Sequence, residues 1–158
     1  MHEVTVKALL VDPVANVPVV ILKQTEGVRL LPIWLGPFEA NAIAVRLENL
    51  TVPRPMTHDL LMSLVAQGGS QVVRVIVCDL RDSTFFAEIV LLRNGAESVV
   101  DARPSDAIAL ALRAGAPIFV SDAVFDKAAL VPEDDDERQR KLHALLDSLA
   151  APEPGELN

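Results

Sequence analysis

The sequence predicts an α+β fold: two duplicated β-β-β-α units that form a mostly antiparallel curved sheet, or a partly open barrel, with packed helices. Three observations predict this class. Runs of β-branched and aliphatic residues come in two groups of three, joined by tight turns. Apolar residues at helical spacing follow each group. Strands joined by tight turns pair antiparallel, and helices grouped between strand sets indicate α+β rather than doubly wound α/β.

Seven candidate strands make up the sheet. They are predicted over residues 2–11, 17–24, 28–35, 71–79, 84–92, 96–101 and 117–120. Asn94-Gly95 is the strongest hairpin signal, because both central positions of a type I′ turn need positive φ. Pro32 lacks a backbone donor, so the third run is expected to be an edge strand or to contain a bulge.

Four helices are predicted between and after these strands. They cover residues 38–50, 58–67, 105–114 and 121–130. Thr57 is a suitable N-cap for the second helix, and Asp59 then lies in its first turn, where the helix dipole favours negative charge. The third helix is apolar nearly all round, so we expect it to be buried.

An internal repeat relates the two units. A slide of 67 positions places segment 37–46 on segment 104–113, and five of the ten aligned positions are identical. Glu39 aligns with Asp106, so both segments keep an acid at the same place, and both end in arginine. The matched order of elements over the whole span favours duplication over chance.

Charge divides the chain into a domain over residues 1–130 and a C-terminal part over 131–158. The chain has 158 residues and a net charge of −8. The domain contains 11 Lys or Arg and 14 Asp or Glu, whereas the C-terminal part contains 3 and 8. We expect the latter to be an acidic linker, a helix and a disordered tail. The helix carries a stripe that must be buried on the body or a partner: Leu142, Leu145, Leu146 and Leu149.

Several protein classes are excluded or disfavoured. The single cysteine, Cys78, rules out an internal disulfide and a cysteine metal cluster. No apolar run reaches the ~18 residues of a membrane helix, and the N-terminus lacks a secretory pattern, so we expect a cytoplasmic protein that does not enter a membrane. The sequence contains no motif typical of serine hydrolases, P-loop proteins, dinucleotide-binding proteins or HExxH zinc enzymes.

Two polar segments stand out in this apolar chain. Residues 54–59 and 101–106 each present an Arg-Pro pair, then a hydroxyl residue, then an acid at the start of a helix. Helix N-termini attract anions, and an adjacent arginine can bind a phosphate with two hydrogen bonds. Nearby carboxylates suit Mg²⁺ or Mn²⁺, which prefer oxygen ligands. These are the groups that metal-assisted phosphodiester hydrolysis needs.

A purely structural role explains the same residues. Thr57 and Ser105 are natural N-caps, which stabilise a helix by about 1 kcal/mol each. The acids suit helix N-termini without any substrate. Arg54 and Arg103 pair equally well with the acids of their own segments.

The segments LPIWLGPFEANAIA, PRPMTHDLL and DARPSDAIALALRAGAPIFV resemble, in this order, the signature blocks of the bifunctional nuclease family of small bacterial and plant proteins. The resemblance covers roughly residues 2–130, and the C-terminal part has no counterpart in it. It implies an α+β fold, nuclease activity on RNA and DNA, and a homodimer.

The leading hypothesis is therefore a nuclease of low sequence specificity that uses a divalent metal, Mg²⁺ or Mn²⁺. Four residues are assigned to catalysis: His58, Asp59, Asp101 and Asp106. Four are assigned to substrate binding: Arg54, Arg103, Thr57 and Ser105. Four are assigned as metal ligands: Glu39, Asp59, Asp101 and Asp106. His58 is the expected general acid or base, because an unperturbed histidine titrates near neutrality.

Two other functions stay open at this point. One is a non-catalytic dimeric binding or regulatory module that uses the Arg-Pro segments for an interface or a small anion. The acidic balance and the few aromatic residues (five Phe, one Trp, no Tyr) favour it, because binding a nucleic acid strand draws on basic groups and stacking rings. The other is an enzyme acting on a small phosphorylated or carboxylated ligand. A positive cleft around Arg54 and Arg103 would favour the nuclease.

Overall fold

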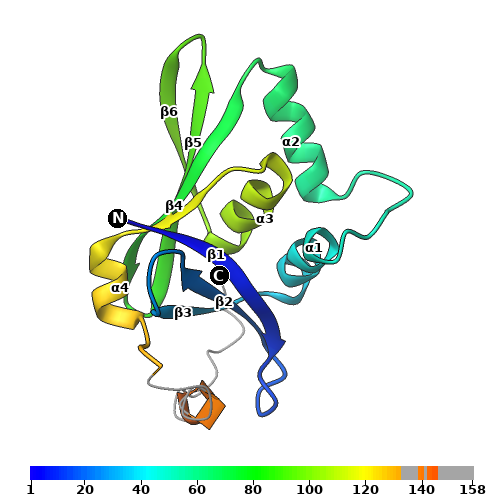
Figure 1. The fold of residues 1–158 in the computed structure, drawn as a ribbon. Coiled ribbons are helices and arrows are strands. Elements are labelled where there is room, and N and C mark those ends of the chain that lie inside the picture. Colours follow the sequence, from blue (N-terminus) through cyan, green and yellow to red (C-terminus); the bar gives the residue numbers. More distant parts are fainter. Residues whose placement is uncertain (133–138, 141, 146–158) are drawn as a thin grey trace.

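The structure is a computed structural model that describes residues 1–132, 139–140 and 142–145. Its strands are β1 (His2–Val11), β2 (Pro18–Gln24), β3 (Leu30–Trp34), β4 (Gln71–Arg81), β5 (Thr84–Arg93), β6 (Ala96–Ala102) and β7 (Ile118–Val120). Its helices are α1 (Pro37–Leu47), α2 (Thr57–Gln67), α3 (Pro104–Ala114) and α4 (Asp122–Ala128) (Figure 1). Every strand and helix predicted within residues 1–130 is present.

The strands form a single sheet in the order β3-β2-β1-β7-β4-β5-β6. All neighbouring pairs are antiparallel except β4 and β7, which run parallel. The sheet is not closed into a barrel, because β3 and β6 remain as its two edges. The α+β class and the mostly antiparallel sheet are thus confirmed. Pro32 lies on the edge strand β3, as its missing donor predicts.

The turn between β5 and β6 has the predicted geometry. Asn94 has φ 51° and Gly95 has φ 77°, so both lie in the left-handed region that a type I′ hairpin needs. Asp82 and Ser83 repeat this pattern between β4 and β5, with φ 49° and 62°. The strands β4, β5 and β6, which we call the second meander, are therefore joined by two tight hairpin turns.

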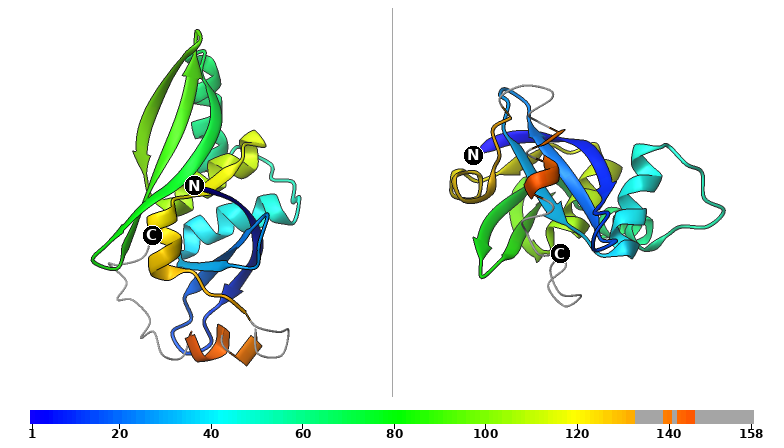
Figure 2. Two further views of the ribbon diagram at one scale, coloured as in Figure 1. Left: turned by 60° about the vertical axis from the view of Figure 1, so that its left-hand side comes forward. Right: turned by 90° about the horizontal axis from the view of Figure 1, so that it is seen from below.

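The repeat seen in the sequence is also present in the element order. β1, β2 and β3 precede α1, and β4, β5 and β6 precede α3. The bounds of α1 and α3 differ by the same 67 positions that align the sequences. Figure 2 shows the two helices packed beside each other against the sheet. Helix α2 has no counterpart and lies between the units in the chain.

The main core lies between the sheet and the helices α1, α2 and α3. Helix α3 is buried almost throughout, as its composition predicts. Helix α4 adds Val124 and Phe125 to the same core. The largest fully buried side chains are Phe125, Ile21, Leu22, Leu31, Ile33, Leu35, Ile43 and Ile108. This core fixes α1 and α3 relative to each other, which decides the geometry of the site below.

The strands β1, β2 and β3 form the first meander. A smaller apolar cluster lies on the face of this meander that points away from the main core. Val19, Ile21 and Leu30 form it, and Trp34 and Leu142 pack against it. One leucine of the predicted C-terminal stripe therefore covers the chain's own body. Residues 139–140 and 142–145 are helical. Leu146, Leu149, residues 133–138, which include the acidic run of the predicted linker, and the predicted tail lie outside the described residues. No helix of the described part is long and apolar enough to cross a membrane.

Candidate functional site

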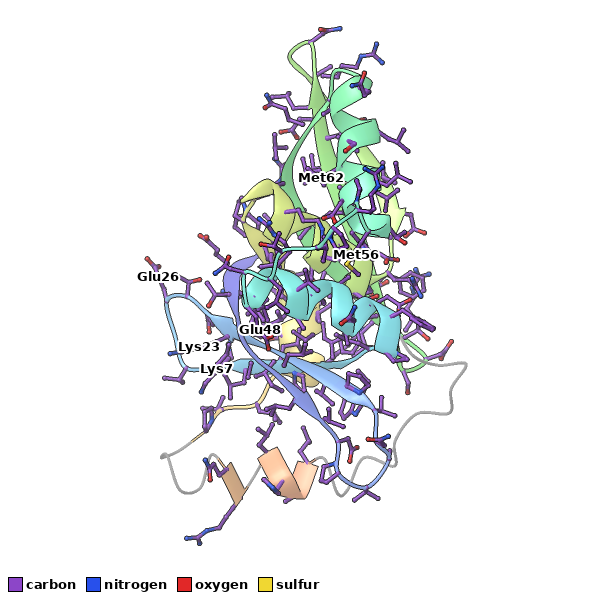
Figure 3. All side chains as sticks on the ribbon, turned by 90° about the vertical axis from the view of Figure 1, so that its right-hand side faces the viewer. Lys7, Lys23, Glu26, Glu48, Met56 and Met62 are labelled. Carbon is purple, nitrogen blue, oxygen red and sulfur yellow. The ribbon has the colours of Figure 1, made fainter. Side chains whose placement is uncertain are left out.

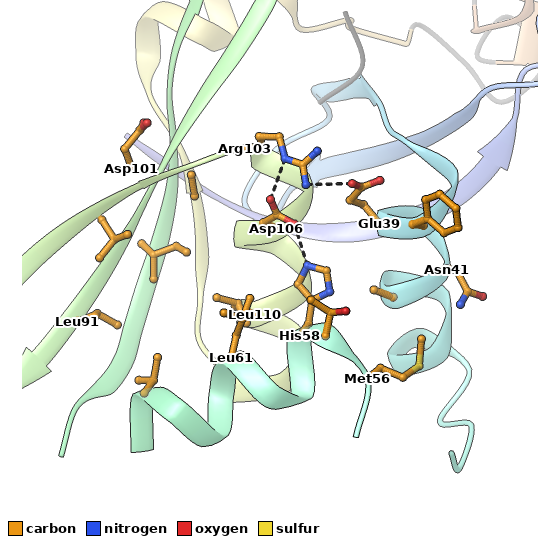
Figure 4. A pocket seen from close by; sticks show the side chains of 17 residues that line it. Glu39, Asn41, Met56, His58, Leu61, Leu91, Asp101, Arg103, Asp106 and Leu110 are labelled. Atoms are coloured by element: carbon orange, nitrogen blue, oxygen red, sulfur yellow. Dashed lines mark hydrogen bonds and ion pairs between the residues drawn. The ribbon is translucent and has the colours of Figure 1, made fainter. Parts of the chain in front are cut away.

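A pocket of about 640 Å³ opens between α2 and the strands β5 and β6, where the first turns of α1 and α3 meet (Figure 4). One end is polar and contains Glu39, Thr57, His58, Arg103 and Asp106. The other end is walled by aliphatic side chains: Leu61, Val65, Ile89, Leu91, Val100 and Leu110. A polar end beside an apolar wall is the usual composition of a small-ligand or substrate pocket.

Four polar residues at this end form a continuous chain of contacts, which we call the His58 cluster. His58 Nε2 lies 2.8 Å from Asp106 Oδ1. Arg103 donates from Nε to Asp106 Oδ2 at 2.8 Å, and its Nη2 lies 2.9 Å from Glu39 Oε1. Helices α1, α2 and α3 each contribute to the cluster, so its geometry depends on how these three helices pack.

The repeat explains why two acids meet at one arginine. Pro37 and Pro104 occupy the first helical position of α1 and α3, where the missing N–H of proline costs nothing. Glu39 and Asp106 then fall in the first turns of the two helices, where the exposed N–H groups favour negative charge. Arg103 immediately precedes α3 and pairs with both carboxylates.

Gly36 occupies the position in the first unit that Arg103 occupies in the second. A Cβ atom at residue 36 would collide with the carboxylate of Glu39, which folds back over the glycine. The colliding group is the end of a flexible side chain, so a larger residue at this position would displace the Glu39 carboxylate rather than the backbone. Glycine at position 36 therefore allows Glu39 to reach Arg103.

The electrostatics of the cluster determine the protonation of its members. Burial alone would raise the pKa of Asp106, but hydrogen bonds from Arg103 and His58 outweigh it and lower that pKa. The hydrogen bond to Asp106 in turn raises the pKa of Arg103. An ionised carboxylate only accepts hydrogen bonds, so His58 Nε2 must donate. In the neutral imidazole, Nδ1 is then a proton acceptor, and it makes no hydrogen bond to the described residues.

A second, separate pair lies behind the pocket. Arg113 donates from Nε to Asp59 Oδ1 at 2.7 Å, and the backbone N–H of Met56 donates to Asp59 Oδ2 at 2.9 Å. The Arg113 side chain is only 4% exposed, and its Nη1 also donates to the carbonyls of Ala42 and Ala109. This pair joins α1, α2 and α3 and so supports the neighbouring residue His58.

Sequence reasoning assigned no role to Arg113. It was visible only as one of the identical positions of the repeat, paired with Arg46. The charge of Arg46 also acts on Asp59: the Met56 N–H, then Arg113 and then Arg46 lower the pKa of this carboxyl. The shared arginine at the end of the two segments was the available signal.

The structure brings four of the nine predicted site residues into the His58 cluster and places Thr57 beside them. Asp59 is not among them, because both of its oxygens are occupied on the far side of α2. His58 and Asp59 are neighbours in a helix and therefore point in directions about 100° apart. Asp59 belongs to the support of the site and does not line the pocket.

Asp101 lies opposite Glu88 across β5 and β6. Both side chains border a smaller pocket on the other face of the second meander, together with Cys78 and Asp79. In Figure 4 the Asp101 carboxylate points away from His58 and Asp106. Asp101 therefore borders the main pocket without joining the His58 cluster.

Three further predicted residues differ from expectation. Arg54 is exposed, does not line the pocket, and makes no hydrogen bond or ion pair with the described residues. Ser105 is fully buried with an unpartnered hydroxyl, so it faces no substrate.

The two predicted N-caps are also not formed. Neither Ser105 nor Thr57 is an N-cap: the caps are Arg103 and Met56, and the Asp59 carboxylate accepts from the Met56 N–H. The prolines and acids that flank these hydroxyls move each helix start one or two residues earlier.

The four predicted metal ligands do not form one ligand set. Glu39 and Asp106 lie together, but Arg103 lies between them and binds both. In the described part of the chain, no group of three or more His, Cys, Asp or Glu side chains is placed to hold a metal ion. The residues as arranged therefore do not fit a preassembled metal centre.

The positive cleft around Arg54 and Arg103 that would favour the nuclease is not formed by the described residues. Among the described residues, Arg103 is the one lysine or arginine that lines the pocket, and it is paired with the carboxylates of Glu39 and Asp106. Lys7 and Lys23 lie on the first meander, in the half of the molecule away from Met56 at the start of α2 (Figure 3). Attraction of phosphates to this pocket therefore depends on Arg103 alone.

The lowered pKa values of Asp59 and Asp106 predict acid destabilisation. Both carboxyls release their protons more readily in the folded chain than at their ordinary pKa of 3.8. The unfolded chain thus binds more protons in this range, so their stabilisation is complete above about pH 5 and is lost as the pH falls through the folded-state values. Urea unfolding between about pH 6 and pH 3 should show this loss.

Asp106→Asn should make that loss smaller, because asparagine does not titrate. An equal fall in the free energy of unfolding for Asp106→Asn and the original chain would contradict the assignment of part of the loss to Asp106.

The sequence of this chain is similar to one domain family and to several known proteins. The bifunctional nuclease domain matches residues 20–133. An uncharacterized protein of Mycobacterium tuberculosis is 44% identical over 138 residues, which cover 87% of this chain and 82% of that protein. Bifunctional nuclease 1 of Arabidopsis thaliana is 32% identical over 108 residues, 66% of this chain but only 33% of the plant protein. Bifunctional nuclease of Oryza minuta is 27% identical over 106 residues, 65% of this chain and 32% of that protein. Because the bifunctional nuclease domain matches most of this chain, the chain belongs to the bifunctional nuclease domain family.

Proposed function

We propose that this chain is a nuclease of low sequence specificity that hydrolyses phosphodiester bonds in RNA and DNA. The observation that carries the proposal is the pairing of His58 with an ionised Asp106 at the polar end of the pocket. This pairing leaves Nδ1 of a neutral His58 as a proton acceptor, and Arg103 beside it is half-exposed and available to a phosphate.

The shared activity on RNA and DNA determines the nucleophile. DNA has no 2′-hydroxyl, so an enzyme that cuts both must activate a water molecule. His58 Nδ1 takes a proton from this water while its oxygen bonds to phosphorus. The bond from phosphorus to the leaving oxygen then breaks, and the protonated His58 or solvent returns a proton to that oxygen. Asp106 holds the imidazole and stabilises the imidazolium that forms.

Arg103 supplies the charge complement in this scheme. Its guanidinium is shared between Asp106 and Glu39, and the Arg103 side chain is 52% exposed, so its free N–H groups can bind the phosphate oxygens. Contacts to phosphate carry no sequence information, which agrees with low specificity. Glu39 acts as a positioning residue that keeps Arg103 at the mouth of the pocket.

Use of Mg²⁺ or Mn²⁺ stays a prediction. Mg²⁺ is commonly held by only one or two carboxylates when substrate phosphates and waters supply the other ligands. Glu39 and Asp106 are the predicted ligands that lie together, and Arg103 competes for both. Metal dependence must therefore be tested with the substrate present.

A non-catalytic dimeric module is the second candidate. Leu60 and Leu64 on α2 are 53% and 59% exposed, and Val99 on β6 is 58% exposed. Exposed apolar residues of this kind suit an interface with a second copy. The homodimer implied by the family resemblance stays a prediction, which light scattering on the purified chain would test.

The proposed nuclease is tested with the full chain and single-stranded RNA and DNA of mixed sequence. We expect both to be cut in the presence of Mg²⁺ or Mn²⁺, and cutting to stop when EDTA is added and to return with excess metal. Cutting that continues in EDTA would refute the metal and leave Arg103 as the cationic group. No cutting under any of these conditions would refute the nuclease and favour the dimeric module.

A further inference from the structure

Phe38 is the most exposed large apolar side chain of the described residues, at 86%. It lies in the first turn of α1 and lines the mouth of the pocket. Its neighbour Glu39 pairs with Arg103, so Phe38 shares a helix turn with the residue that holds the cation assigned to the phosphate. A single exposed apolar residue is ordinary on a protein surface, but its place at the rim of the polar pocket is specific.

The packing of α1 does not require this ring. The buried residues of α1 are Ala40, Ala42, Ile43 and Val45, and none of them needs Phe38 as a cover. The equivalent position of the second unit is Ser105, which is fully buried. The repeat therefore places a small residue inside one helix start and a solvent-facing aromatic ring at the other.

We infer that Phe38 is a stacking platform for one base of a single-stranded nucleic acid whose phosphate binds Arg103. The inference rests on the proposed function and names how the substrate is held. Every base has a flat face that can stack on an aromatic ring, so such a platform tolerates any sequence. Bases inside a duplex are already stacked and cannot reach it.

The charge of the pocket determines how much of the binding affinity must come from stacking on Phe38. One arginine paired with two carboxylates provides little attraction for a phosphate backbone. Stacking and apolar contact must then supply most of the affinity, and binding should depend only weakly on salt. For single strands, the slope of log K against log salt is about −0.7 per phosphate contact, so we expect a slope near that of one contact.

The test uses the full chain and a short single-stranded oligodeoxynucleotide that carries the fluorescent base 2-aminopurine and phosphorothioate linkages, which resist cleavage. Binding should quench the fluorescence as the base stacks. Phe38→Ala should weaken binding at least about fivefold, the lower end for loss of one base–aromatic contact. Phe38→Trp should retain binding, whereas Phe38→Leu, which is apolar but has no ring, should resemble Phe38→Ala. Val14→Ala is the matched control, because Val14 is 79% exposed but lies in the turn between β1 and β2.

The outcomes separate this inference from the proposed function. If the original chain cuts and binds single strands and Phe38→Ala does so equally well, the platform is refuted and the nuclease stands. If the original chain neither binds nor cuts, both are refuted. If Phe38→Ala converts a dimer to a monomer by light scattering, Phe38 belongs to an interface between copies and the platform is again refuted. A steep dependence on salt would also contradict it.

Discussion

Alanine in place of His58 is expected to lower the rate of phosphodiester cleavage roughly 10²- to 10⁴-fold, the range for loss of a general base. The loss should appear in kcat rather than in KM, because in the proposed mechanism His58 acts on the nucleophile and Arg103 binds the phosphate. His58→Gln should be as inactive, since its amide can still donate to Asp106 but has no basic nitrogen. Single-turnover cleavage of a labelled oligonucleotide measures this rate.

Asp106→Asn and Asp101→Asn form a matched pair for this prediction. Asp106→Asn should reduce the rate strongly, because a neutral amide no longer stabilises the imidazolium. Asp101→Asn should leave the rate within about twofold, since Asp101 lies opposite Glu88 across β5 and β6 and makes no contact with the His58 cluster. Equal rates for His58→Gln and the original chain would refute the assigned base and point to a contaminating nuclease. Thermal unfolding of each variant shows whether it is folded.

The second large effect is on stability. Asp59→Ala should lower the free energy of unfolding by about 3–5 kcal/mol, because it leaves the Arg113 guanidinium buried without its counter-ion. The Arg113 side chain is 4% exposed and the Asp59 side chain 30%, so most of the guanidinium would stay out of water once the carboxylate is lost. Urea unfolding at neutral pH measures the difference.

The ion pair between Arg74 and Glu97 is the control for that effect. It has two short hydrogen bonds, but its side chains are 32% and 48% exposed. Glu97→Ala should therefore lower the free energy of unfolding far less than Asp59→Ala does, because water and salt screen an exposed ion pair. Arg113→Met combined with Asp59→Ala should recover much of the loss, because the buried charge is removed as well. A cost for Asp59→Ala no greater than that of Glu97→Ala would contradict the supporting role of the buried pair.

Short sequence patterns were sufficient to predict the strands and helices and their order along the chain. Asn94-Gly95 and Pro32 act through backbone geometry within a few residues, so the hairpin and the edge strand follow directly from them. The helices α1 and α3 follow from apolar spacing and from the repeat. The parallel pairing of β7 with β4 depends on where the chain returns after α3, and no local pattern encodes it.

The site was predictable as a set of segments but not as a set of contacts. His58 and Asp59 are adjacent, and only the packing of α2 decides that one meets Asp106 and the other Arg113. Asp101 precedes Arg103 by two residues, yet the register of β6 directs it to the other face of the sheet. Phe38 was overlooked because exposure cannot be read from the identity of a residue in a helical pattern.

Helix α2 stands outside the repeat, and this has a consequence for how the chain is organised. The two related helices supply the anchoring acids, whereas the proton acceptor comes from a segment found in only one unit. Framework and reactivity therefore come from different parts of the chain, and the Asp59–Arg113 pair is the tie that holds the inserted segment in place on the two related helices.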